Sequence, residues 1–206
     1  MGEPFVITIG RQLGSGGREV GRMLAEQLQI AYYDSEILGL AAKESGFTPD
    51  IFARMDEHRS FLQHLIGAVA PVMNSGDFYG NQMSGEHLFK LQSEAIRKAA
   101  AEQSCVFIGR AADYVLRHHP RCLNIFLAAE MEDRIKRVMQ FDKVRATEAV
   151  KRIEKGDNKR AGFYNFYTQG TWGAASNYHI CLNTSALGVE ETVKIIKRIV
   201  EEKFYK

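Results

Sequence analysis

A glycine-rich segment near the N-terminus constrains this chain more than any other. Residues 5–9 (Phe-Val-Ile-Thr-Ile) predict a buried strand, and residues 18–28 have the apolar spacing of an amphipathic helix. Between them stand glycines at positions 10, 14, 16 and 17. A strand, a glycine turn and a helix N-terminus form a phosphate cradle, because glycines let the backbone approach an anion and the helix dipole favours negative charge. The segment therefore predicts a phosphate or nucleotide site.

This cradle departs from the usual P-loop pattern, G-x-x-x-x-G-K-[ST]. Gly17 stands where lysine should follow Gly16, and Arg18 and Glu19 come next. The helix dipole disfavours an arginine in the first turn unless an anion is bound there, so we expect Arg18 to contact phosphate and to replace the missing lysine. The predicted phosphate-binding residues are Arg11, Gly14, Ser15, Gly16, Gly17, Arg18 and Glu19.

Two other interpretations of the cradle are weaker. A glycine turn without a ligand would lose conformational entropy on folding with no binding function to explain its glycines. A dinucleotide fingerprint, G-x-G-x-x-G, fails because Glu19 stands where the third glycine should be.

Length and composition are those of an ordinary globular protein. The chain has 206 residues, 45% hydrophobic and 25% charged, which fits one domain with a core of its own. The net charge of +2 and the absence of a basic, aromatic stripe argue against nucleic-acid binding. Neither a membrane-length apolar stretch nor a signal-peptide pattern is visible, so we expect a cytoplasmic protein. The three cysteines lack metal-ligand spacing, and we expect no protein-held metal site.

Short apolar runs alternate with helical patterns along the chain. Strands separated by helices predict an α/β fold with a parallel sheet, here of five strands with helices on both faces. Two stretches, about 46–84 and about 155–176, supply no strand. The predicted strands are Phe5–Ile9, Ile30–Tyr33, Cys105–Ile108, Leu123–Ala128 and His179–Asn183, and the predicted helices are Arg18–Leu28, Ser35–Glu44, Gly85–Ala101, Glu130–Gln140, Thr147–Lys155 and Val189–Lys203.

Several arginines follow the predicted strands, where the carboxyl edge of an open α/β sheet binds ligands. Arg110 comes directly after a predicted buried strand, and Arg160 lies in the second stretch without a strand, about 155–176. Arg134 and Arg137 share a helix that could equally be a solvated face with acidic partners, and Arg160 could be surface charge. Phosphoryl transfer mainly needs positioning and positive charge. We expect catalytic roles for Arg18, Arg110, Arg137 and Arg160.

Blocks spread over most of the chain resemble the cytidylate kinase-like family of bacteria. They are residues 7–21, 32–38, 109–116, 157–160, 172–178 and 182–185. The resemblance implies a three-layer P-loop NTPase fold in a single nucleoside monophosphate kinase-like domain, 1–206. Within it the core would be 1–45 and 85–206, the acceptor-binding insertion about 46–84 and the lid about 155–176. It also implies ATP, Mg²⁺ bound with the nucleotide, and an acceptor resembling CMP or dCMP.

The resemblance carries over to single residues in the acceptor site. Asp34 and Ser35 match the start of a D-[ST]-G motif of true cytidylate kinases, although Glu36 replaces its glycine, and Leu40 stands where true cytidylate kinases have an arginine. Arg110 matches the arginine of G-R-D, while Ala111 replaces the acid unless Asp113 substitutes for it. The acceptor-binding residues that this implies are Asp34, Ser35, Lys90, Arg110, Asp157 and Arg160.

Two alternatives to a nucleoside monophosphate kinase stay open. Loss of the lysine and of the acid beside Arg110 would suit a nucleotide-binding sensor or partner protein without transfer activity. The altered acceptor motifs would suit a kinase for a small molecule other than a nucleotide. In each case we expect a nucleotide and a small molecule as partners, without nucleic acid or membrane, and the sequence leaves a homodimer open.

Overall fold

The computed structural model describes residues 3–34 and 85–205. They belong to two units, one made of residues 3–34 and 99–205, the other containing residues 85–98. The predicted helix Ser35–Glu44 and the insertion at about 46–84 lie outside the described residues. The first unit contains the sheet and is described below.

Five parallel strands form the sheet of this unit, as the alternation of elements predicted. They are β1 (Val6–Arg11), β2 (Ala31–Tyr33), β3 (Cys105–Ile108), β4 (Cys122–Ala128) and β5 (Ile180–Asn183), in the spatial order β2-β3-β1-β4-β5. Every pairing of neighbouring strands is parallel. The α/β fold class predicted from the sequence is therefore confirmed.

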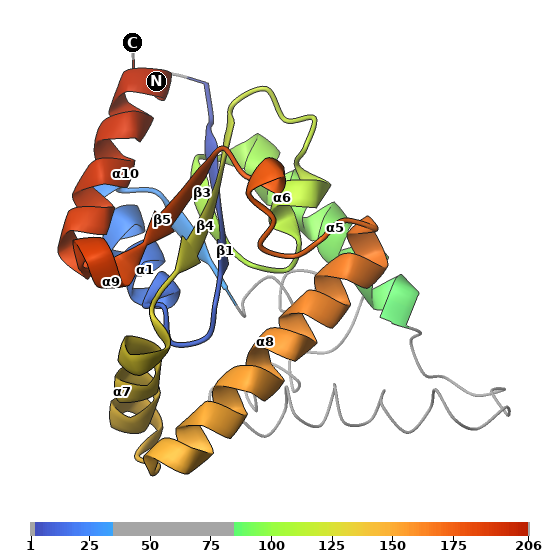
Figure 1. Cartoon of the computed structure of the whole chain (residues 1–206). Coiled ribbons are helices and arrows are strands. Elements are labelled where there is room, and N and C mark those ends of the chain that lie inside the picture. The colour runs from blue at the N-terminus through green and yellow to red at the C-terminus, as the bar shows by residue number, and fades with distance from the viewer. Residues whose placement is uncertain (1–2, 35–84, 206) are drawn as a thin grey trace, which may run out of the picture. The chain divides into compact units, whose positions relative to one another are not determined.

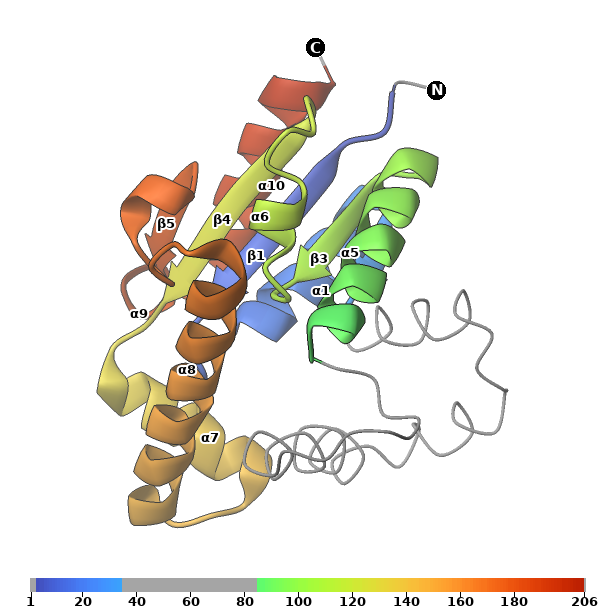
Figure 2. The same ribbon diagram turned by 90° about the vertical axis from the view of Figure 1, so that its right-hand side faces the viewer.

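Helices cover both faces of the sheet. Helices α1 (Gly17–Leu28) and α10 (Val189–Phe204) pack together on one face, and α6 (Ala112–Val115) and the upper part of α8 (Ala146–Thr168) lie on the other (Figures 1 and 2). The remaining helices are α5 (Gly85–Glu102), α7 (Met131–Asp142), α9 (Thr184–Leu187) and the 3-10 helix η2 (Ala175–Asn177). None of the described helices is both long and apolar enough to cross a membrane.

The main core lies between the sheet and the helix pair α1 and α10. Ile7 and Ile9 of β1 are fully buried there, with Leu24 of α1 and Ile196 of α10. A second cluster joins α7 to α8 through Val138, Ala149 and Ile153, and Leu13 packs on it. That second cluster brings the α7–α8 hairpin against the loop that follows β1.

Helix α8 is longer than its sequence pattern predicted. The predicted helix Thr147–Lys155 continues without a break to Thr168. Gly156 lies within it and packs on Leu13, where a Cβ would lie 3.1 Å from a Leu13 methyl carbon. Packing on Leu13 thus stabilises the helix at Gly156, although glycine destabilises an isolated helix.

Strand β1 occupies the centre of the sheet. The later strands are added first on one side of β1 and then on the other. After β1 the chain passes to the β2–β3 side, and later to the β4–β5 side. Ligands of open α/β sheets bind at the carboxyl ends of the strands beside such a change of side. The loop after β1 stands at that point.

Candidate functional site

The loop between β1 and α1 has the backbone of a phosphate cradle. Gly14 and Gly16 have φ values of +79° and +77°, a region that residues with side chains avoid. At Gly14 an added Cβ would also lie 2.7 Å from the backbone oxygen of Arg134. The Ser15 hydroxyl donates to the backbone oxygen of Gln12 at 2.9 Å, which closes the turn. The glycines are therefore required by the path of the loop.

Helix α1 begins at this loop without a side-chain cap among the described residues. Gly16 is its N-cap, and the first intrahelical bond runs from Val20 N–H to the Gly16 carbonyl at 3.0 Å. The N–H groups of the first turn have no partner within a helix, and the dipole places partial positive charge there. The helix N-terminus is thus available to an anion.

Four arginines from separate elements lie beside the loop near the carboxylate of Asp34. Arg18 Nε lies 2.7 Å from Asp34 Oδ2, and Arg11 Nη2 lies 3.8 Å from Asp34 Oδ1. The charge of Asp34 also acts on Arg110 and Arg160, where it opposes the lowering of their pKa values by burial. The side chains of Arg11 and Arg18 differ in burial, with 14% and 64% of their surface exposed. We call these five residues the arginine cluster.

Burial and mutual repulsion disfavour the charged forms of this cluster. Burial, followed by the charge of Arg160, lowers the pKa of Arg11 to about 9, although Asp34 opposes the shift. The pKa values of Arg110 and Arg160 are lowered as well, again mainly by burial. An anionic ligand would reduce this penalty, because Asp34 and Asp157 supply only two negative charges against the four positive charges of the arginines.

Arg110 stands in a strained turn at the carboxyl end of β3. Gly109, Arg110 and Ala111 all have positive φ values, of 72°, 60° and 52°. Residues with side chains adopt this conformation at a cost of about 1–2 kcal/mol each. Such strain persists where the surroundings hold it, and it is concentrated at functional sites. The strained turn therefore indicates that Arg110 is a candidate ligand contact.

A second set of residues braces the loop between β1 and α1 from the side of α7 and α8. Arg134, nearly buried, donates from Nε to the Leu13 carbonyl at 2.7 Å and pairs with Asp157. Asp157 Oδ1 accepts a bond from the Leu13 N–H at 2.7 Å and one from Arg160 at 3.2 Å. Both polar groups of one loop residue are thereby tied to α7 and α8. Arg134 is buried in this network, so the solvated-face interpretation of it is wrong.

Arg137 and Thr184 hold the other side of the loop. Arg137 Nη1 donates to the Gly14 carbonyl at 3.1 Å and to Thr184 Oγ1 at 3.4 Å. The hydroxyl of Thr184, itself buried, donates to the Ser15 carbonyl at 2.7 Å. Sequence reasoning missed Thr184 as a site residue. Its position directly after the last strand was the available signal, because the carboxyl ends of all five strands share one edge.

The other predicted residues have different surroundings. Glu19 is exposed on the first turn of α1, and Lys90 is exposed on α5 in the second unit. Ser35 lies outside the described residues. Asp113, considered as a substitute for the missing acid, is buried and accepts a 2.7 Å bond from the Tyr164 hydroxyl.

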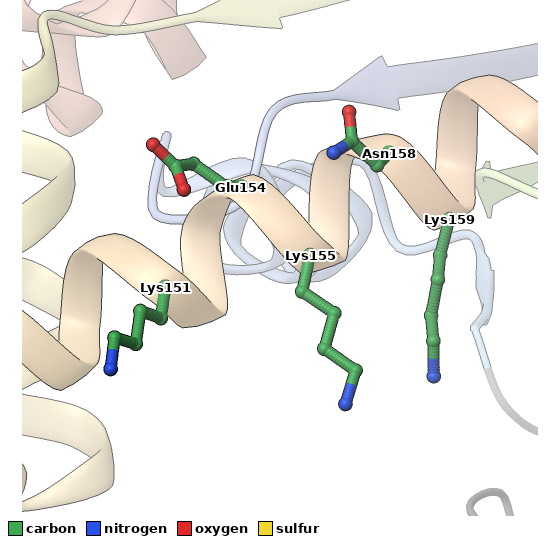
Figure 3. Close-up of a pocket in the computed structure, with 5 residues that line it drawn as sticks. All are labelled: Lys151, Glu154, Lys155, Asn158 and Lys159. Carbon is green, nitrogen blue, oxygen red and sulfur yellow. The ribbon is translucent and has the colours of Figure 1, made fainter.

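A hollow of about 560 Å³ lies along α8, separate from the arginine cluster. Lys151, Lys155 and Lys159 extend from one side of the helix in Figure 3, with Glu154 and Asn158 completing the lining. Four residues of helix rise about 6 Å, so the lysine side chains leave the helix about 6 Å apart. They add positive charge to α8 without lining the arginine cluster.

The described residues include carboxylates that suit a Mg²⁺ ion bound with a nucleotide. No group of three His, Cys, Asp or Glu residues that could hold a metal occurs in residues 3–34 and 85–205. Mg²⁺ in kinases is bound largely by substrate phosphates with one or two carboxylates. Asp34 is a carboxylate beside the loop, and Glu19 is a second one on the first turn of α1. This donor set fits Mg²⁺ delivered with a nucleotide.

Comparison with protein families identifies the chain's relatives. The family model of the cytidylate kinase-like family matches residues 6–186. The chain belongs to the cytidylate kinase-like family. No curated protein sequence matches it significantly.

Solved structures share the fold of this family member. A crystal structure of an uncharacterized protein from Eubacterium ventriosum is 26% identical, with a TM-score of 0.70 over 96% of this chain and 98% of that one. Shikimate kinase from Bacteroides thetaiotaomicron is 12% identical, with a TM-score of 0.53 over 96% and 98% of the two chains. Shikimate kinase from Acinetobacter baumannii is 15% identical, with a TM-score of 0.50 over 98% and 95%. At these identities the likeness to the two kinases shows a shared fold.

Proposed function

We propose that this protein transfers the γ-phosphoryl group of Mg-ATP to a small anionic acceptor, with CMP or dCMP as the first candidate. The observation that carries the proposal is the arginine cluster beside an uncapped helix N-terminus. Arg11, Arg18, Arg110 and Arg160 bring four positive charges to a site with two carboxylates, Asp34 and the Asp157 that pairs with Arg160. Membership of the cytidylate kinase-like family supports a nucleotide as donor and a monophosphate as acceptor.

The geometry suits a reaction that depends on positioning and positive charge. In phosphoryl transfer the acceptor oxygen bonds to the γ-phosphorus while the bond to the bridging oxygen breaks and ADP leaves. The loop N–H groups and the α1 N-terminus would hold the donor phosphates. Arg110 and Arg160 would hold the acceptor's anionic group, since planar guanidinium groups bind phosphate in a bidentate manner. Mg²⁺, when bound with ATP, neutralises developing charge on the phosphates.

The bracing residues would keep the loop in one shape during this reaction. Arg134 and Asp157 fix Leu13 from the α7–α8 side, and Arg137 with Thr184 fixes Gly14 and Ser15 from the other. A preorganised cradle stabilises transferring charge more than a mobile one, because no reorganisation is needed at the moment of reaction.

A kinase for a small molecule other than a nucleotide is the second candidate. It is favoured by the fold shared with shikimate kinases and by Ala111, which stands beside Arg110 where true cytidylate kinases have an acid. A carboxylate acceptor would suit the same arginines. The sensor alternative would keep nucleotide binding without transfer.

An acceptor panel separates these candidates. The protein is incubated with Mg-ATP and CMP, dCMP, UMP or shikimate, and ADP formation is measured. We expect transfer to a cytidine monophosphate and a roughly 100-fold lower kcat/KM in Arg110→Ala, the scale of losing one charged contact to the transition state. The exposed Arg198→Ala on α10 is the matched control. ATP binding without transfer to any acceptor would favour the sensor.

A further inference from the structure

Positions 11 and 17 compete for the same space at the phosphate loop. A Cβ atom built on Gly17 would lie 2.7 Å from the Cβ of Arg11 and 2.8 Å from its Cγ. Non-bonded carbon atoms pack at about 3.5–4.0 Å, so these two positions cannot both carry side chains without a backbone shift. One of them must be glycine.

The backbone conformation at position 17 does not require a glycine. It is the first residue of α1 and is absent from the glycines with positive φ, which in the described residues are Gly14, Gly16, Gly109, Gly173 and Gly188. In helical positions glycine is less stable than alanine by up to about 1 kcal/mol. The space taken by Arg11 therefore accounts for the glycine.

The P-loop pattern places these two residues at its two ends. In G-x-x-x-x-G-K, counting back from Gly16, the first glycine falls at position 11 and the lysine at position 17. This chain has the reverse arrangement, with a cation at the first position and glycine at the last. The contact between them gives the physical reason, because a side chain at either position excludes one at the other.

The guanidinium group of Arg11 extends toward the carboxyl ends of β2 and β3. A Cβ on Gly109 would lie 1.9 Å from Arg11 Nη1, so the guanidinium runs directly over the carboxyl end of β3. Its Nη2 lies 3.8 Å from Asp34, at the end of β2. Arg11 thus passes from the phosphate loop toward Arg110. Arg18, by contrast, is mostly exposed and is paired with Asp34 at 2.7 Å.

We propose that Arg11 replaces the missing P-loop lysine and contacts the transferring phosphoryl group, with Gly17 and Gly109 providing the space for its side chain. The inference rests on the proposed kinase function for the reaction itself. It assigns to Arg11, in place of Arg18, the positive charge that lies between donor and acceptor. As a catalytic residue, Arg11 touches the phosphate oxygens that gain charge during transfer.

The first test uses stability and needs no ligand. Gly17→Ala should lower the melting temperature of the wild-type protein by roughly 5 °C through overpacking. In an Arg11→Gly background the same change should be neutral or stabilising, because the space is vacant and alanine favours the helix. Equal shifts in both backgrounds would overturn the steric link.

The second test uses inorganic pyrophosphate, whose binding by calorimetry does not require turnover. Arg11→Gly should weaken binding tenfold or more, and Arg11→Ala, which keeps a better strand former, should do the same. Arg11→Gly/Gly17→Lys restores the usual pattern and should recover most of the affinity. Gly17→Lys alone should not improve it, and the exposed Arg22→Ala should leave it unchanged.

Comparison with Arg18→Ala decides between the two arginines. A larger loss in Arg18→Ala than in Arg11→Gly, with no recovery in the Arg11→Gly/Gly17→Lys protein, would overturn the proposal. Failure of wild type to transfer phosphate from Mg-ATP would count against the kinase function, whereas the pyrophosphate series would still decide the role of Arg11. Active wild type with an equally active Arg11→Gly would overturn this inference alone.

Discussion

The Tyr164 hydroxyl donates a 2.7 Å hydrogen bond to the carboxylate of Asp113, and both side chains are 7% exposed. The bond joins α8 to α6, the short helix that follows the strained turn of Arg110. Arg160 lies one helical turn before Tyr164 on α8. The bond therefore ties α8, which carries Arg160, to the helix that directly follows the turn of Arg110.

Removing this hydroxyl should loosen the arginine cluster as well as the fold. Tyr164→Phe should reduce the free energy of unfolding by about 1–3 kcal/mol, because a buried carboxylate loses its donor. We also expect the acceptor KM to rise several-fold with a smaller change in the KM for ATP. Urea unfolding and steady-state kinetics measure the two effects. Tyr114→Phe, on α6 itself, is the control, and an unchanged acceptor KM in Tyr164→Phe would contradict the prediction.

Asp113 should give the stability a defined pH dependence. Burial raises the pKa of Asp113, although the bond from Tyr164 opposes the shift. Between the ordinary pKa of about 4 and the raised value, the folded state binds more protons than the unfolded state, so stability falls as pH rises. Urea unfolding from pH 3 upward should show wild type losing stability relative to Asp113→Asn above about pH 4, until Asp113 is ionised in the folded state. Parallel curves for the two proteins would contradict this.

Two glycines with the same φ separate backbone strain from steric overlap. Gly14 and Gly188 both have φ of +79°, but a Cβ on Gly14 meets Arg134 whereas one on Gly188 has no atom within 4 Å. Gly188→Ala should lower the free energy of unfolding by about 1–2 kcal/mol and leave ATP affinity unchanged. Gly14→Ala should add about 1–3 kcal/mol of overlap and greatly weaken ATP binding. Calorimetric titration with Mg-ATP checks both, and equal ATP affinities would show that the loop tolerates the side chain.

The contact between Asp157 and the phosphate loop should matter for both stability and nucleotide affinity. Asp157→Ala leaves the nearly buried Arg134 without its carboxylate and the Leu13 N–H without its acceptor. We expect a loss of about 3–5 kcal/mol in unfolding free energy, the scale for breaking a buried ion pair, and weaker ATP binding. Asp133→Ala, which removes a more exposed carboxylate paired with Lys136, should cost far less, because solvent screens that ion pair. Similar losses in the two variants would refute the bracing role.

Much of the fold could be predicted because it depends on neighbouring residues. Periodicity located all five strands, and the alternation of strands with helices predicted the parallel sheet. The end of α8 could not be predicted, because Gly156 lowers helix propensity locally and only its packing on Leu13 offsets this. Asp113 was considered as a substitute acid, but the partner that engages it, Tyr164, is 51 residues away in sequence.

The sequence by itself determined that a glycine cradle follows the first strand, that its lysine is missing and that arginines follow the later strands. These are properties of contiguous residues, and local conformational preference expresses them directly. Only the tertiary structure decided which side chains meet. It placed Arg11 over Gly17 and Gly109, paired Arg18 with Asp34, and brought Asp157 to the N–H of Leu13 across 144 residues. Such contacts depend on the order of strands in the sheet and on the packing of α7 and α8, which no local pattern encodes.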